Sequence, residues 1–328
     1  MLYNNSNTFQ RRFVTGRFTL TMLLVGATLL WLIGVLGRVA IGEAPHSFLS
    51  FSLPLWMCGA LSFGVYMVTA LILNSFVIIE GRTPWLGGLF MWLTACSLVL
   101  QCNIAVALSV LVVVLLLALL VGCYPRENVQ KWVYSAFLFL SLAVLFLPQY
   151  IYLLPLFFIY IAMTGVLGVR TVLAALLGVA TPLWFLYCSS PVFPEVSLFC
   201  KDVMGGIDSV LKLTFEVPAL PFMLSMAVEA VVLLSAAVVF AGSTSPAKPL
   251  MRRMLLFVIC ANICLCVLSW FVNGSIEVLL AWRLPGFAIS VAYIFSLRFN
   301  KLYNIAFWIF NIMCIAIAAV FGVWIWIF

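Results

Sequence analysis

Charged residues are scarce in this sequence: Asp, Glu, Lys and Arg make up 8% of its 328 residues, against about 25% in soluble domains. Hydrophobic residues make up 66%. A bilayer core about 30 Å thick needs roughly 20 apolar residues per helix, so the chain has room for about eleven helices and for no soluble domain. Its long apolar runs exclude an outer-membrane barrel, whose strands alternate over about ten residues. The sequence therefore predicts a polytopic, all-α transmembrane bundle.

Recognisable catalytic and metal-binding motifs are missing as well. The sequence contains no Walker-type GKS or GKT loop, no HExxH and no G-x-S-x-G. One histidine cannot form a His-rich zinc site, and most of the ten cysteines lie in apolar runs, where cysteine behaves as a small hydrophobe. We expect no metal and no cofactor, and we interpret Cys260, Cys264 and Cys266 as packing residues. The sequence leaves open whether Cys188 and Cys200 form a disulfide, and whether the protein is an enzyme.

The apolar segments divide the chain into a single integral membrane domain, 1–328, with two groups of spans. Residues 1–188 hold spans 1–7, residues 189–221 form a polar loop, and residues 222–328 hold spans 8–11. The segments on either side of Pro148 also fit a re-entrant hairpin, so the expected number of spans is about 10 to 12. The expected spans are 19–41, 55–79, 86–100, 104–121, 133–147, 151–168, 172–188, 222–241, 254–272, 276–297 and 304–326.

The distribution of Lys and Arg predicts the orientation, because cytoplasmic loops retain positive charge. With the N-terminus in the cytoplasm, twelve of the 16 basic residues lie on the cytoplasmic side. The opposite side holds only Arg38, Lys201, Lys212 and Arg283. The cytoplasmic loops thus account for most of the net charge of +7, which gives no reason to expect nucleic-acid binding. We expect the C-terminus and the loop 189–221 to be extracytoplasmic.

The loop 189–221 is the one stretch too polar to lie in hydrocarbon. Its second half predicts an amphipathic helix at the interface, since apolar residues recur at helical spacing up to Phe215 and charges are four apart from Asp208 to Glu216. We interpret Pro191, Pro194 and the pair Gly205–Gly206 as breakers. The helix is either a structural lid over the bundle or a cover for substrate.

Two charged residues stand out inside the spans. Glu229 and Arg283 each lie about eight residues into a helix that enters from the extracytoplasmic side, roughly 10 Å deep. An acid at a helix centre costs about 2.5–3.5 kcal/mol and usually finds a partner inside the bundle. The two are therefore candidate partners. The pair either lines a charged cavity or is a neutralised structural contact, unless each residue snorkels independently.

Further polar residues gather near the extracytoplasmic side. Arg38 ends the first span, Glu43 and His46 follow in the loop, and Glu277 begins another span. Arg38 and Arg283 suit a phosphate or carboxylate, which guanidinium binds through two parallel hydrogen bonds. Glu43 or Glu229 is a candidate general base. The alternative is that Arg38 and His46 are interfacial anchors.

Part of the chain resembles a known family. Leu73-Asn74-Ser75-Phe76, the basic turn at 126–131, the run Phe146-Leu147-Pro148-Gln149-Tyr150, and Arg170 followed by Gly178 and Pro182 resemble an uncharacterised multi-spanning inner-membrane family of the Bacteroidetes group. The resemblance covers about residues 70–190. It implies the inner membrane of a Gram-negative bacterium and carries no established activity.

Three functions fit the sequence. The first is the handling of a lipid-linked or anionic substrate at the extracytoplasmic leaflet, as an enzyme or an accessory protein. The chain is distantly similar to glycosyltransferases that use polyprenyl-phosphate sugars and place an acid where Glu43 lies, although their second acid has no counterpart here. The second is a transporter or flippase with Glu229 and Arg283 along the path. The third is a non-catalytic subunit of a membrane complex.

Overall fold

The computed structural model describes most of the chain as helix. The described residues are 13, 19–42, 47–48, 51–75, 85–122, 128–191, 193–212, 215, 218–241, 249–272, 276–297 and 301–327. Within them are twelve α-helices, labelled α2 to α13, and two short 3-10 helices. The all-α prediction is confirmed, apart from a two-stranded antiparallel hairpin of two residues per strand.

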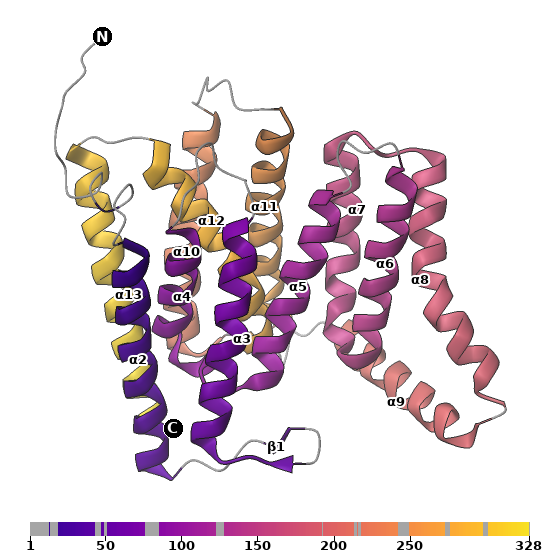
Figure 1. Cartoon of the computed structure of the whole chain (residues 1–328), viewed down its shortest axis with the longest axis horizontal. Coiled ribbons are helices and arrows are strands. Elements are labelled where there is room, and N and C mark those ends of the chain that lie inside the picture. Colours follow the sequence, from indigo (N-terminus) through magenta and orange to yellow (C-terminus); the bar gives the residue numbers. More distant parts are fainter. Residues whose placement is uncertain are drawn as a thin grey trace.

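The helices of the first half are joined by short turns. In chain order the elements are α2 (Thr19–Ile41), β1 (Ser47–Phe48), β2 (Phe51–Ser52), α3 (Leu55–Ser75), α4 (Leu86–Cys96), η1 (Leu98–Leu100), α5 (Ile104–Gly122), α6 (Val129–Phe146), η2 (Pro148–Tyr152), α7 (Leu153–Thr164) and α8 (Val169–Ser189). Successive helices run in opposite directions, so α2, α4, α6 and α8 all begin at the end of the bundle where the N-terminus lies (Figure 1).

The second half begins with the amphipathic helix and ends with four long helices. These elements are α9 (Pro194–Leu211), α10 (Leu220–Ala241), α11 (Pro249–Leu268), α12 (Ile276–Leu297) and α13 (Lys301–Ile327). Helices α11 and α13 begin at the N-terminal end of the bundle, and the C-terminus lies at the opposite end (Figure 1).

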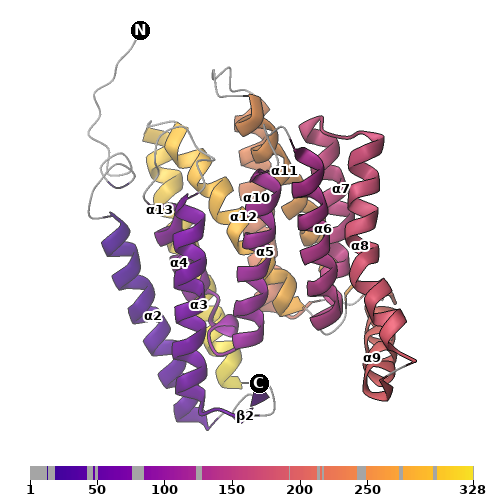
Figure 2. The same ribbon diagram turned by 45° about the vertical axis from the view of Figure 1, so that its right-hand side comes forward.

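Eight of the described helices are long and apolar enough to cross a membrane. The chain is therefore a multi-pass membrane protein. The other three expected spans each contain a helix: α4 has 11 residues, α7 belongs to a short apolar segment, and α11 falls outside the eight. Because α4 is only about 16 Å long, it cannot cross a 30 Å hydrocarbon core alone. It stops short of the lower ends of α2 and α3 (Figure 2).

Helix α12 lies at the centre of the bundle. Within its apolar window 89% of the residues are buried, whereas every other candidate span is buried by half or less. It packs against α4, α5, α10 and α11. This position explains how a helix with Glu277, Arg283 and an internal Pro285 can lie in a membrane, since it is surrounded by protein and not by lipid.

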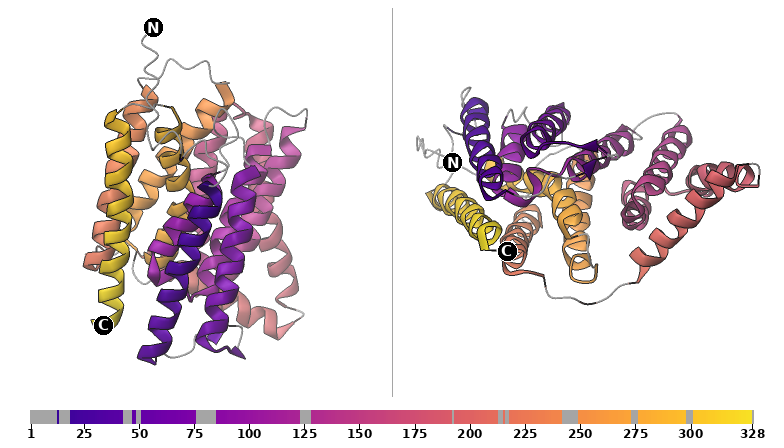
Figure 3. Two further views of the ribbon diagram at one scale, coloured as in Figure 1. Left: turned by 60° about the vertical axis from the view of Figure 1, so that its left-hand side comes forward. Right: turned by 90° about the horizontal axis from the view of Figure 1, so that it is seen from below.

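Helices α6, α7 and α8 form a group at one side of the molecule, with α9 beneath them (Figure 1 and the right view of Figure 3). Gly178 of α8 fits tightly against α6: a Cβ there would lie 2.7 Å from the carbonyl oxygen of Tyr134. The hydroxyl of Ser141 also donates to the carbonyl of Val179 (3.0 Å). Gly178 thus permits a close helix–helix contact of the kind that small residues allow in membranes.

The loop 189–221 differs from the prediction in the extent of its helix. Helix α9 begins at Pro194 and ends at Leu211, so the helix begins earlier in the loop than predicted and Phe215 lies beyond its end. Reading Pro194 and Gly205–Gly206 as breakers was wrong: proline suits the first helical position, and both glycines lie inside the helix. Gly206 packs against Pro148, which lies only 2.8 Å from where its Cβ would be.

Helix α9 does not lie over the centre of the bundle. It packs against η2 and α8, and the hydroxyl of Tyr152 donates to the carbonyl of Val210 at 2.5 Å. Beyond the helix, Phe215 stacks on Trp270 with ring centroids 6.1 Å apart. The loop therefore covers the turn between α6 and α7 and the end of α11, and a lid over the whole bundle is the wrong description.

Candidate functional site: a buried ion pair between two central helices

The structure brings Glu229 and Arg283 together, as the equal depths predicted. Nε of Arg283, on α12, lies 3.4 Å from Oε2 of Glu229, on α10. The side chains are 0% and 4% exposed. These two atoms have no hydrogen-bond geometry between them, so the contact is an ion pair held by charge. The expectation of independent snorkelling is wrong, because both charges stay inside the bundle.

Two further polar side chains adjoin the pair. Ser225 lies one turn before Glu229 and donates its hydroxyl to Oε1 of Glu229 at 3.4 Å. Cys266, on α11, interacts electrostatically with both Arg283 and Glu229. A thiol is a weak acceptor, so it satisfies little of the guanidinium. The site is thus formed by α10, α11 and α12, with one full negative charge facing one positive charge.

Most of the Arg283 guanidinium remains without a partner. Within the described ranges, neither terminal nitrogen, Nη1 or Nη2, has a hydrogen-bond partner, although the side chain is fully buried. These two nitrogens carry four of the five N–H donors of arginine. A buried donor that makes no hydrogen bond costs about 1–3 kcal/mol, and more when it is charged. The arrangement therefore offers a set of strong, fixed donors to an anionic oxygen.

The residue before Arg283 fixes the rotation of α12. Trp282 stacks on Tyr150 of η2 with ring centroids 4.8 Å apart, and its indole nitrogen donates to the hydroxyl of Ser109 at 2.9 Å. The hydroxyl of Tyr150 donates to the backbone carbonyl of Ser109, 3.0 Å away. Because α5, η2 and α12 meet at these three side chains, Arg283 is held pointing toward α10.

Close packing between α11 and α12 supports the same arrangement. At Gly286 a Cβ would lie 1.9 Å from Nδ2 of Asn262, so a larger residue there would displace the Asn262 side chain. Asn262 donates to the carbonyl of Val258 at 2.8 Å. A small cavity of about 40 Å³ lies beside Asn262 and Trp282 and is lined mainly by apolar side chains.

Arg38 lies in a different place from Arg283. Its Nη2 donates to the carbonyl of Leu98 in η1 at 3.1 Å, and the residue is 6% exposed. Nearby, Nε2 of Gln101 donates to the carbonyl of Ala95 at 3.0 Å. Arg38 therefore contacts carbonyl oxygens beyond the end of α4, where a positive charge is favourable. Arg38 was expected to form a basic pair with Arg283, but in the structure it contacts η1.

The remaining candidates divide into one described residue and two that are not. Glu277, in the first turn of α12, interacts electrostatically with the buried Tyr66 of α3. Glu43 and His46 lie outside the described residues. Both Cys188 and Cys200 are free thiols, so no disulfide joins them. In the part of the chain that the structure describes, no three His, Cys, Asp or Glu side chains are grouped to hold a metal ion.

The sequence pointed to neither Ser225 nor the turn at 97–103 as part of a site, and it indicated Cys266 only as a packing residue. Ser225 carries a readable signal, because it lies four residues before Glu229 on the same helix face. The turn also has one, since Ser97, Gln101 and Asn103 interrupt an otherwise apolar run. Cys266 has none, because its neighbours on other helices follow only from the packing.

Comparisons with family models, with curated proteins and with solved structures find no match to this chain. The class of multi-pass helical membrane protein therefore rests on the helices themselves.

Proposed function

We propose that this is an inner-membrane protein with about eleven spans, its N-terminus in the cytoplasm and its C-terminus outside. The alternating helix directions support this topology, since α6, α8, α11 and α13 begin at one end and carry Lys131, Arg170, Arg252, Arg253 and Lys301 in their first turns. Reporter fusions at Gly206 should report the periplasm, and fusions after Gly165 should report the cytoplasm. The reverse pattern would refute the topology. The resemblance to the Bacteroidetes family supports the inner membrane of a Gram-negative bacterium.

We propose further that the protein handles an anionic substrate, lipid-linked or free, from the extracytoplasmic side, as an enzyme or as an accessory to one. The observation that carries this proposal is the guanidinium of Arg283, which is fully buried and, among the described residues, has only the weak contact with Cys266 besides Glu229. Phosphate and carboxylate oxygens match the planar fork of a guanidinium. Arg283 lies about ten ångströms from the start of α12, the end that faces the α9 side.

Glu229 supplies the counter-charge in the resting state. When Arg283 turns its donors to an anion, Glu229 loses part of its compensation, and a buried carboxylate is costly to keep ionised without a cation. Proton uptake by Glu229 would restore neutrality at the site. Binding of an anion is therefore expected to be accompanied by uptake of one proton, with Ser225 remaining as the hydrogen-bond donor.

Binding measurements on the purified protein in nanodiscs test this function. The probes are a polyprenyl phosphate, the uncharged polyprenol, and inorganic phosphate. We expect the polyprenyl phosphate or the phosphate to bind, and Arg283→Gln combined with Glu229→Gln to weaken binding roughly tenfold or more, the loss of about one charge-assisted hydrogen bond. The control is Arg170→Gln, an exposed arginine in the first turn of α8.

The outcomes separate the substrate classes. Binding of polyprenyl phosphate but not of phosphate identifies a lipid-linked substrate, whereas binding of both identifies the phosphate group alone. Equal binding of the polyprenol and its phosphate, or an unchanged affinity in the double variant, would refute the role of Arg283. Such a result would favour a non-catalytic subunit of a membrane complex.

A transporter or flippase is the second candidate, and the interrupted helices favour it. The helical path breaks at 97–103 between α4 and α5, and again at Leu147, whose backbone is extended before η2. Transporters place substrate sites where helices break at membrane depth. Proteoliposomes loaded with a fluorescent anionic lipid analogue test it: accelerated movement between leaflets that depends on Arg283 supports a flippase, and no movement despite binding rejects it.

A further inference from the structure

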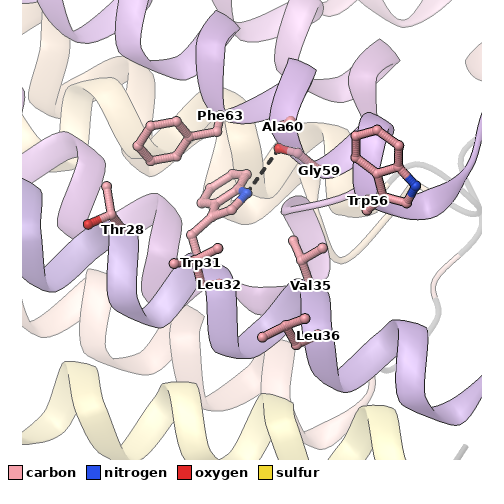
Figure 4. A pocket seen from close by; sticks show the side chains of 9 residues that line it. All are labelled: Thr28, Trp31, Leu32, Val35, Leu36, Trp56, Gly59, Ala60 and Phe63. Carbon is pink, nitrogen blue, oxygen red and sulfur yellow. Dashed lines mark hydrogen bonds between the residues drawn. The ribbon is translucent and has the colours of Figure 1, made fainter.

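A groove runs between α2 and α3 at the lipid-facing surface. It has a volume of about 450 Å³ and is lined by nine residues of these two helices (Figure 4). Thr28 and Trp56 lie at opposite ends of it, with Trp31 and Val35 between them (Figure 4). Along α2 the lining extends from Thr28 to Leu36, about 12 Å. The groove therefore occupies the half of these helices that leads to the α2–α3 connection.

The side chains that line the groove are apolar or, in Trp31 and Thr28, already hydrogen-bonded to the backbone, apart from the indole of Trp56 at its end. The indole nitrogen of Trp31 donates to the carbonyl of Gly59 at 3.0 Å, and the hydroxyl of Thr28 donates to the carbonyl of Val25 at 2.8 Å. The indole of Trp56, in the first turn of α3, belongs to a residue that is 61% exposed. Tryptophan concentrates where hydrocarbon meets head groups. The groove thus suits hydrocarbon along its length and ends at the depth of lipid head groups.

Its size distinguishes between possible occupants. A helix about 10 Å wide and 12 Å long fills on the order of 1,000 Å³, more than twice the groove. A single hydrocarbon chain is narrow enough to lie between α2 and α3, and the volume is within the range of about 300–1,000 Å³ found for small-molecule sites. A hydrocarbon chain can therefore lie inside the groove, whereas a partner helix could insert only its side chains.

Arg38 adds a positive charge near the end of the groove that leads to the α2–α3 connection. It continues the buried stripe of α2 that includes Trp31 and Val35, one turn beyond Val35. Its guanidinium is already bound to Leu98, so it acts on a lipid through its field and not through a new hydrogen bond. A positive charge beside the head-group end favours a negatively charged lipid, since partly buried charges are weakly screened.

We propose that the groove between α2 and α3 is a binding site for one hydrocarbon chain of an anionic membrane lipid, with the lipid head at the end marked by Trp56 and Arg38. The proposal does not depend on Arg283, which lies on α12 and contacts α10. It assigns a lipid site to the N-terminal helices, separate from the anion site of the central helices.

Photo-crosslinking tests the site in nanodiscs of phosphatidylcholine. The probe is phosphatidylglycerol with a diazirine halfway along one acyl chain, and adducts are mapped by mass spectrometry. We expect peptides covering 28–36 and 56–63 to be labelled at least threefold more than the lipid-facing surface of α8 around Leu177 and Trp184, which are 60% and 65% exposed. Equal labelling of the groove and of α8 would mean ordinary lipid contact and would overturn the proposal.

Substitutions that fill the groove with a larger side chain provide the matched comparison. Ala60→Phe places a ring in the groove from an exposed position, and we expect at least a threefold loss of groove labelling with α8 labelling unchanged. Leu61→Phe, at the adjacent exposed position outside the lining, should have no effect. If Ala60→Phe does not fold, Ala60→Leu provides a smaller obstruction with the same expected direction. Labelling that persists in the folded variant rejects the site.

Two further experiments test which lipid head group is preferred and whether a lipid or a second copy of the protein occupies the groove. The same diazirine chain on phosphatidylcholine should label the groove at least twofold less than on phosphatidylglycerol, and equal labelling rejects the preference for an anionic head. If the protein runs as a dimer and the groove carries no lipid adduct, a second copy covers it and the proposal is wrong.

Discussion

Removal of one charge from the Glu229–Arg283 pair should be far more damaging than removal of both. Glu229→Gln keeps the shape of the side chain and the hydrogen bond from Ser225 but leaves Arg283 with no negative partner. Arg283→Met keeps an unbranched side chain of similar volume and leaves Glu229 as a buried, uncompensated acid. Combining the two substitutions leaves no net charge at the site.

The magnitude follows from the burial of both groups. The side chains are 0% and 4% exposed, and Nε of Arg283 lies 3.4 Å from Oε2 of Glu229. Breaking such a pair from one side costs about 3–5 kcal/mol, because the remaining charge stays buried without compensation. Replacing both partners by uncharged groups of similar volume is close to neutral, and can stabilise a protein by about 1–4 kcal/mol. We therefore expect the double variant to lose much less stability than the sum of the losses in the two single variants.

Thermal unfolding in a fixed detergent, followed by tryptophan fluorescence, measures this cycle. We expect each single variant to unfold at a clearly lower temperature and the double variant to recover most of the loss. The control is Glu195→Gln, which removes an exposed acid from the first turn of α9 and should leave stability unchanged. Additive losses in the double variant would show that the two residues act independently, and the reasoning from burial would be refuted.

Two further substitutions test the packing. Gly178→Ala should destabilise the protein by about 1–3 kcal/mol, because the added Cβ would lie 2.7 Å from a backbone oxygen of α6, while Gly64→Ala, with nothing within 4 Å, should be neutral in the same thermal assay. Arg38→Met should cost about 1.5–3 kcal/mol through the lost hydrogen bond to Leu98, and Arg38→Lys should recover part of it; equal losses for Met and Lys would contradict a role for the charge.

The sequence predicted the helices well because hydrocarbon imposes a simple rule on the chain. Each of the eleven apolar runs contains a helix, since backbone groups in lipid must be satisfied within the segment. The lengths of the helices were predicted less well. The run 86–100 ends its helix at Cys96, because carbonyls freed there find donors in Arg38 and Gln101, and these contacts depend on the arrangement of α2 and η1.

The depth of each charged residue along its helix was the most useful guide to the site. Counting residues from the helix ends placed Glu229 and Arg283 at one level, and the ion pair confirms that pairing. Depth says nothing about which helices are neighbours, so it also grouped Arg38 with Arg283, although Arg38 faces η1. Glycines show the same limit: a Cβ at Gly178 would meet the backbone of α6, whereas a Cβ at Gly64 would face open space.

The central position of α12 has a consequence for how the protein is made. This helix carries Arg283 well inside the span, and the bilayer would resist such a charge by about 2.5–3.5 kcal/mol at a helix centre. Its four neighbours, α4, α5, α10 and α11, all precede it in the chain and are synthesised first. When α12 leaves the ribosome, a protein-lined place is therefore ready, and a chain that lacked these neighbours would have to insert Arg283 into lipid.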